Sequence, residues 1–339
     1  MGFLQENCIL FNLFGHYIRD KIFDIARICM ETIEISNIES LPCGANPHQN
    51  AGISKIADGV EYEILSRNKD LEYIDYINLS ENVKLLGEFF DVNSAVITKE
   101  GFVCAVALGA TADEAFAKVM DSDPISITGS SAGFSKEVNL ETAKLLNSLK
   151  IRNVISSAFS KEAFSYLLDT DINMILIKTP LYELQGFCAK DIKVTPFGIL
   201  VQEQNASKLS KENFKVVSVN KPTQVQVEDA VFGWKVSKHL KSISVVVAKD
   251  LSAKAIVQGR SNMIVAVESA MDSACENSKD AVMVLDCPIE TSQVLNTAIQ
   301  GRIGLIVESG DGSKSGEILK QADKYGISMI FTKIRNKRY

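Results

Sequence analysis

The chain has few of the residues that carry metal and disulfide chemistry. Its 339 residues include three histidines, one tryptophan and seven cysteines, and no two cysteines form a C-x-x-C pair. An odd, scattered set of thiols is typical of reduced cysteines in a cytoplasmic protein rather than of a disulfide framework. Because no cysteines have zinc-ligand spacing, the sequence predicts no structural metal.

Long apolar runs are also missing. No segment approaches the length that crosses a bilayer, and the amino terminus lacks the basic start and cleavage site of a secretory signal. The net charge of −6 argues against nucleic acid as the main partner. We therefore expect a soluble cytoplasmic protein that binds neither nucleic acid nor membrane. Its 46% hydrophobic content is enough for a large core.

What the chain does contain is an internal repetition. Residues 93–109 and 242–259 each hold a β-branched run that ends in a lysine and an acidic residue, followed by a second apolar run. Such a pattern predicts a β-hairpin. After each hairpin, helical and strand segments alternate in the same order: helix, strand, helix, strand, helix, strand. This order predicts an α/β fold of two similar three-layer lobes, although generic α/β units can also resemble one another by chance.

The repetition also suggests where the domains lie. Residues 1–38 have apolar positions at helical spacing and predict a short helical arm. We expect a first lobe over residues 39–203 and a second over residues 204–339, which meet in a polar segment. Duplicated lobes usually meet along a shared face, where ligands often bind.

Several distinctive strings occur in a fixed order along the two predicted lobes. They include GANPHQ at 44–49, DPISITG at 123–129 and DAVFGWKVSKHLKS at 229–242. From residue 39 onward the chain resembles the AICAR transformylases. These form the folate-dependent formyltransferase half of a bifunctional purine-biosynthesis family whose other half is IMP cyclohydrolase. The resemblance implies a duplicated, cytidine-deaminase-like fold and a homodimer. No cyclohydrolase domain is expected, because only about forty residues precede the match.

The resemblance implies a reaction of de novo purine (IMP) biosynthesis. A formyl group would move from the co-substrate 10-formyltetrahydrofolate to the amine of AICAR, a purine-precursor nucleotide. That amine is a weak nucleophile, so catalysis needs a base and a group that stabilises developing negative charge. The family places a lysine and a histidine on the first hairpin, and this chain has Lys99 and Glu100 there. Lys99 is thus implied to stabilise charge, with Glu100 as the base.

Other positions are implied to contact the substrate. They are Asn46, His48, Asp123, Lys241, Ser242 and Arg335. The chain departs from the family pattern where an Arg-Tyr pair reads Pro42 and Cys43, where an asparagine reads Ile243, and where the aromatic folate wall reads VMVL at 282–285. Two hypotheses follow. The chain is an AICAR formyltransferase, or it is an inactive paralogue that acts as a nucleotide-binding, regulatory or structural subunit.

Three features have a structural alternative. His48 fits a buried turn at least as well as a role in chemistry. Lys99 fits a solvent-exposed hairpin tip, as Lys249 does in the second hairpin, or a position facing the ligand. Lys235 and Lys238 share a helical face with Ser242, which predicts either a basic stripe along the cleft or an ordinary solvated surface.

Overall fold

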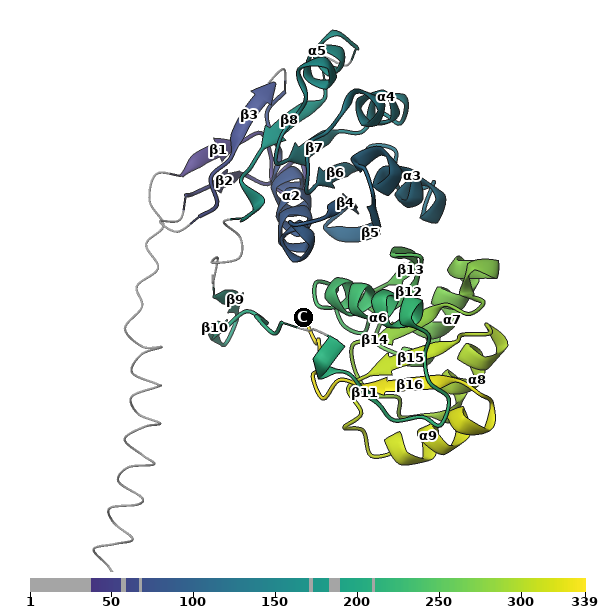
Figure 1. The fold of residues 1–339 in the computed structure, drawn as a ribbon. Helices are drawn as coiled ribbons and strands as arrows, with labels where there is room; N and C mark the ends of the chain where they lie inside the picture. Colours follow the sequence, from purple (N-terminus) through teal and green to yellow (C-terminus); the bar gives the residue numbers. More distant parts are fainter. Residues whose placement is uncertain (1–37, 56–58, 67–68, 171–172, 183–189, 209–210) are drawn as a thin grey trace, which may run out of the picture. The chain divides into compact units, whose positions relative to one another are not determined.

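The computed structural model describes residues 38–55, 59–66, 69–170, 173–182, 190–208 and 211–339 (Figure 1). The predicted helical arm, apart from Ile38, lies outside this range. The chain forms two compact units, one of residues 1–40 and 52–55 and the other of residues 41–51 and 56–339. The second unit contains the bulk of the fold.

The first half of the main sheet runs in the order β5-β4-β6-β7-β8-β3. Its strands are β3 (Glu63–Ser66), β4 (Asn93–Lys99), β5 (Phe102–Gly109), β6 (Ser131–Phe134), β7 (Asn153–Ser156) and β8 (Ile175–Lys178). β4 and β5 form the predicted hairpin, while β6, β7 and β8 are parallel to one another. β3 closes the edge in the antiparallel direction.

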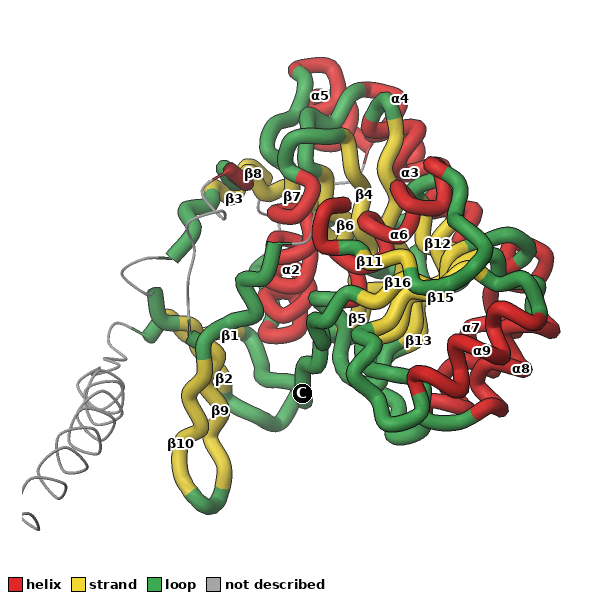
Figure 2. Tube along the Cα trace, turned by 60° about the horizontal axis from the view of Figure 1, so that its bottom comes forward, coloured by secondary structure: helices red, strands yellow, loops and turns green. Residues whose placement is uncertain are grey.

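The second half repeats this order as β13-β12-β14-β15-β16-β11. Its strands are β11 (Lys215–Val216), β12 (Val245–Lys249), β13 (Ser252–Val257), β14 (Val282–Leu285), β15 (Leu305–Glu308) and β16 (Ser328–Phe331). β5 and β13 adjoin through the Ala107–Ser252 pair, so the halves form one twelve-stranded mixed sheet. Two short pairs form separate two-stranded sheets: β1 (Glu39–Leu41) with β2 (Ala51–Ile53), and β9 (Asp191–Thr195) with β10 (Gly198–Gln202) (Figure 2).

Helices cover both faces of the main sheet. The α-helices of the described residues are α2 (Tyr73–Leu86), α3 (Ala112–Ser122), α4 (Leu140–Ser148), α5 (Lys161–Thr170), α6 (Gln224–Ser237), α7 (Met263–Ala274), α8 (Ser292–Gln300) and α9 (Ser315–Lys324). α2 and α6 share one apolar core that spans both halves. The other helices enclose a separate core in each half, α3–α5 in the first and α7–α9 in the second. The predicted α/β class is confirmed.

Strand periodicity explains why the sheet has two apolar faces. Along β4, Val96 joins the core under α2, while Ala95 and Ile97 join the core under α3–α5. Successive side chains of a strand point to opposite faces, so a continuous apolar run fits a strand that is buried on both sides. Among the described residues, no helix combines the length and apolar character that a bilayer crossing requires.

Candidate active site

The first predicted catalytic residue lies at the end of β4. The Lys99 ammonium donates a hydrogen bond to the Thr128 carbonyl oxygen at 2.9 Å, so this half-buried side chain is held against the loop before β6. Glu100 follows in the hairpin turn with a left-handed φ of 53° and is exposed. Asn78 of α2 holds the turn, because its side-chain oxygen accepts from the Gly101 amide at 2.8 Å. Lys99 is therefore anchored, while Glu100 faces solvent.

Cys104 lies beside two of the predicted residues. Burial raises the pKa of its thiol to about 11; the negative charge of Asp123 adds to this increase, while a hydrogen bond from Ser126 and the charge of Lys99 oppose it. Asp123 caps the end of α3, and its carboxylate accepts from the Ser126 amide at 3.0 Å. Lys99 and Asp123 thus share one neighbourhood, and a neutral thiol lies within it.

Lys241 reaches the same hairpin from the second half. Its ammonium lies 4.5 Å from the centroid of the Phe102 ring, and Phe102 is the cross-strand partner of Lys99. The Lys241 amide donates to the Gln258 side-chain oxygen at 3.2 Å, and the Gln258 side-chain nitrogen donates to the Val103 carbonyl at 2.8 Å. The cation–π contact and the amide bridge bring the segment carrying Lys241 against the hairpin carrying Lys99.

Ser242 connects this segment to the carboxyl-terminal residues. Its amide donates to the Arg338 carbonyl at 2.8 Å, and its hydroxyl accepts from the Arg338 amide at 3.0 Å. The Arg338 guanidinium forms two hydrogen bonds with the Glu81 carboxylate, at 2.6 and 2.7 Å, which raise the pKa of Arg338. Such bidentate geometry orients the guanidinium and holds the end of the chain against α2.

Arg335, three residues upstream, is paired with an acidic residue. Its Nε donates to the Asp311 carboxylate at 2.8 Å, and about half of each side chain is exposed. Glu308 at the end of β15 is fully buried, and burial raises its pKa to about 7 although its carboxylate accepts from the Ile289 amide. Arg335 therefore has a carboxylate partner already, and no hydrogen bond or ion pair within the described ranges joins it to Lys99.

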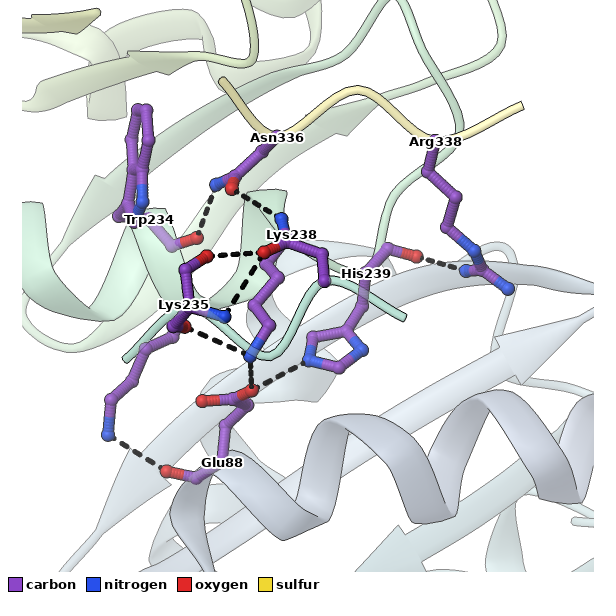
Figure 3. A network of polar contacts seen from close by, with 9 residues as sticks. Glu88, Trp234, Lys235, Lys238, His239, Asn336 and Arg338 are labelled. Carbon is purple, nitrogen blue, oxygen red and sulfur yellow. Dashed lines mark hydrogen bonds and ion pairs between the residues drawn. The ribbon is translucent and has the colours of Figure 1, made fainter. Parts of the chain in front are cut away.

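The basic residues in the last turn of α6 and directly after it contact the first half of the chain, so their interpretation as an ordinary solvated surface is wrong (Figure 3). The Lys238 ammonium lies 2.7 Å from a Glu88 carboxylate oxygen, and His239 Nε2 lies 3.1 Å from the same oxygen. Lys235 donates to the Glu88 carbonyl at 2.9 Å. Glu88 belongs to the 3-10 helix η1 (Gly87–Phe89), so this stripe joins the two halves of the chain.

The turn that carries Asn46 and His48 is held by its own contacts. The Asn46 side-chain amide donates to the Gln49 side-chain oxygen at 2.8 Å, and the Gly44 amide donates to the Gln49 carbonyl. His48 is exposed, so its interpretation as part of a buried turn is wrong; the short turn leaves its side chain on the surface. In the part of the chain that the structure describes, no hydrogen bond or ion pair links Asn46 or His48 to Lys99 or Lys241.

Sequence reasoning missed the carboxylates that organise this region. Glu81 and Glu88 lie in or just after α2, where nothing in the local pattern distinguishes them from surface residues. Their role depends on partners more than a hundred positions away in the chain. Among the residues described, no three His, Cys, Asp or Glu side chains are placed to hold a metal ion.

Comparison with known proteins identifies the family. Residues 12–273 match the family described as AICARFT/IMPCHase bienzyme, and the chain belongs to that family. It is 34% identical to the bifunctional purine biosynthesis protein PurH of Caldicellulosiruptor saccharolyticus over 98% of this chain and 64% of that relative. It is also 34% identical to PurH of Thermoanaerobacter sp. over 86% of this chain and 57% of that relative. The resemblance predicted from the motifs is therefore confirmed.

The chain matches only part of the length of these related proteins. The chain spans about 64% of the length of the PurH proteins from the two Caldicellulosiruptor species, C. saccharolyticus and C. bescii. One solved structure, Acinetobacter baumannii RibD, overlaps 30% of this chain and 34% of its own with a TM-score of 0.23 and 11% identity, which is too low to bear on the fold.

Proposed function

We propose that this chain transfers a formyl group from 10-formyltetrahydrofolate to the amine of AICAR, a step of purine biosynthesis. Family membership supports the reaction class. The observation that carries the proposal is the contact between the two halves at the first hairpin. Phe102, the cross-strand partner of Lys99, lies under the Lys241 ammonium. Lys99 and Lys241 thus place two positive charges at one end of the hairpin. The substrate carries a phosphate, and further negative charge develops on it during the reaction, so a site for it requires such charges.

The roles follow from position and charge. Lys99 stabilises the negative charge that develops on the formyl oxygen, and Glu100 accepts the proton of the AICAR amine; the formyl C–N10 bond then breaks, and tetrahydrofolate leaves with a proton on N10. Glu100 is exposed and able to meet a ligand, although a carboxylate is intrinsically a weaker base than the imidazole that the family places here. We assign Asp123, Lys241, Ser242, Arg335, Asn46 and His48 to substrate binding.

The test combines binding with turnover. Calorimetric titration with AICAR and with a folate analogue measures binding, and a formyl-transfer assay measures activity. Lys99→Ala is expected to lower turnover at least tenfold, and Glu100→His to raise it. The matched control is Lys249→Ala, because Lys249 makes the equivalent contact in the second hairpin, to the Lys279 carbonyl at 2.8 Å. If the two lysine variants lose activity equally, Lys99 has no catalytic role.

A second candidate is a nucleotide-binding or regulatory subunit without catalysis. Two observations favour it: a glutamate follows Lys99 where the family places histidine, and Arg335 is paired with Asp311. This candidate predicts that AICAR binds while no formyl product forms, with or without Glu100→His. Failure of both ligands to bind would contradict both candidates and leave only a structural role.

We also propose that residues 39–203 and 204–339 arose by duplication and form two deaminase-like lobes of one chain. Two such chains form a homodimer. Matching polar contacts support the duplication. Asn78 of α2 accepts from the amide of Gly101 in the first hairpin, and Asp229 of α6 accepts from the amides of Asp250 and Leu251 in the second. Sedimentation of the purified chain tests the dimer, and a monomer at all concentrations would contradict it.

A further inference from the structure

A pocket of about 690 Å³ lies in the first half, at the carboxyl ends of β6, β7 and β8. Its wall includes Lys136, which follows β6 by two residues, Ser157, which directly follows β7, and Lys178, which ends β8. Ligands of open α/β sheets bind outside the carboxyl ends of the strands, and this volume is in the range of small-molecule sites. None of the residues assigned to the transferase reaction lines it.

Neither lysine of this pocket has an acidic partner in the described ranges. Across the residues that the structure describes, neither Lys136 nor Lys178 forms an ion pair, whereas Lys238 and Lys144 each meet a carboxylate oxygen at 2.7 Å. Glu63 is the cross-strand partner of Lys178, yet the two do not form an ion pair either. Both ammonium groups are therefore available to an anionic ligand, and lysine binds phosphate as a point charge.

Aromatic side chains form another part of the wall. Tyr62 and Tyr182 line the pocket while 44% and 66% exposed, and Phe90 lines it from the segment after η1. Exposed rings beside a pocket offer a face on which a planar heterocycle stacks. Glu61 and Glu63 add acceptors for sugar hydroxyl or amine donors. The wall thus carries groups for a phosphate, a flat ring and a sugar.

We propose that this pocket binds a nucleoside monophosphate, at a site separate from the transferase site. Its phosphate lies at Lys136 and Lys178, and its base lies against Tyr62 and Tyr182. The proposal rests on the pocket itself and does not depend on the formyl-transfer reaction.

The corresponding strand end of the second half is built differently. Lys178 ends β8 opposite Ser156 of β7, and Phe331 ends β16 opposite Glu308 of β15, so Lys178 and Phe331 occupy the same place in their lobes. Phe331 is 8% exposed, and its ring packs closely against Gly310 in the loop after β15. A Cβ atom added to Gly310 would lie only 2.2 Å from the Phe331 ring. An apolar ring closes that strand end, while the exposed Lys178 leaves its own open.

The experiment is photolabelling of the full chain with 8-azido-AMP, followed by peptide mapping, together with calorimetric titration with AMP. We expect label on the peptides that contain Tyr62 or Tyr182. The double variant Lys136→Met/Lys178→Met is expected to lose that label and to raise the Kd for AMP at least tenfold. The matched control Lys144→Met removes an exposed lysine of α4 and is expected to change neither result.

Two further arms separate this site from the transferase site and identify the ligand group. Lys99→Met/Lys241→Met is expected to leave the Tyr62 and Tyr182 label intact, whatever it does to formyl transfer. Inorganic phosphate and adenosine are each expected to bind more weakly than AMP. Label that maps only to other peptides, label that survives loss of both pocket lysines, or phosphate that binds as tightly as AMP would each overturn the proposal.

Discussion

Glu88 and His239 contact one another from equivalent places in the two halves of the chain. The carboxylate oxygen lies 3.1 Å from Nε2, and the residues are 151 positions apart. The helices that precede them, α2 and α6, begin at Tyr73 and Gln224, which are also 151 positions apart (224 − 73). The carboxyl-terminal ends of α2 and α6 thus meet, and Lys238 supplies the charge that Glu88 requires.

Removal of the Glu88 charge is expected to destabilise the protein. The Glu88 and Lys238 side chains are only 20% and 12% exposed, so Glu88→Gln leaves a largely buried ammonium without its partner. We expect a loss of about 3 kcal/mol in the free energy of unfolding, measured by urea denaturation at pH 7. The control Glu141→Gln breaks an exposed ion pair of the same 2.7 Å length and should cost less than about 1 kcal/mol. Equal losses would contradict this account.

The same carboxylate predicts a loss of stability in acid. Burial alone would raise the pKa of Glu88, but hydrogen bonds and charge from His239 and Lys238 hold it at about 2. A depressed carboxyl pKa contributes stability above the unfolded value of about 4.5, and this contribution is lost as the pH falls toward 2. Burial also lowers the pKa of His239, so the folded state disfavours the charged imidazole. The free energy of unfolding therefore decreases further as the pH falls below about 6.5. Unfolding of Glu88→Gln should be less steeply pH-dependent between pH 4.5 and 2.

Glu308 is expected to have the opposite effect. Burial raises its pKa to about 7, so the folded state favours the protonated carboxyl. Stability should therefore fall as the pH rises from about 4.5 to 7, because the folded state binds the proton that the unfolded state releases. Glu308→Gln is expected to stabilise the protein at pH 8 by on the order of 2 kcal/mol relative to wild type, and to have little effect at pH 4.5. The exposed control Glu317→Gln should show no such difference.

The cysteines are expected to differ sharply in reactivity. Burial raises the pKa of Cys104 to about 11 and that of Cys287 to about 12, so both remain thiols at pH 8. Cys275 is exposed. Since the thiolate is the nucleophile, iodoacetamide should alkylate Cys275 at least tenfold faster than the other two, as followed by mass spectrometry of the peptides. Fast labelling of Cys104 in folded protein would show that its thiol is not buried as described.

The hairpin turns are expected to depend on single polar side chains of α2 and α6. Asp229→Ala removes the acceptor for two backbone amides, and Asn78→Ala removes the acceptor for one. Each change leaves amide donors unsatisfied near the sheet, which costs about 1–3 kcal/mol per group. We expect Asp229→Ala to lower the free energy of unfolding more than Asn78→Ala does. Amide hydrogen exchange at Leu251 and Gly101 reports the loss locally.

The sequence was sufficient to predict the family and the order of elements. The strings at 44–49, 123–129 and 229–242 are specific, and the family match confirms what they indicated. The alternation of apolar residues predicted hairpin, helix and strand in each half, and the structure has that order. Both depend on local features, either a motif or a short-range period, which neighbouring residues are enough to encode.

Only the tertiary structure decided what the charged residues do. The spacing of Lys235 and Lys238 placed them on one helical face, but it did not specify which surface that face would meet. Their contacts with Glu88, which is far away in the chain, give the two lysines a structural role. Likewise Lys178 and Phe331 end equivalent strands, and only packing shows that one leaves a pocket open while the other closes it. Burial and charge pairing depend on residues that are distant in sequence, so a local pattern cannot specify them.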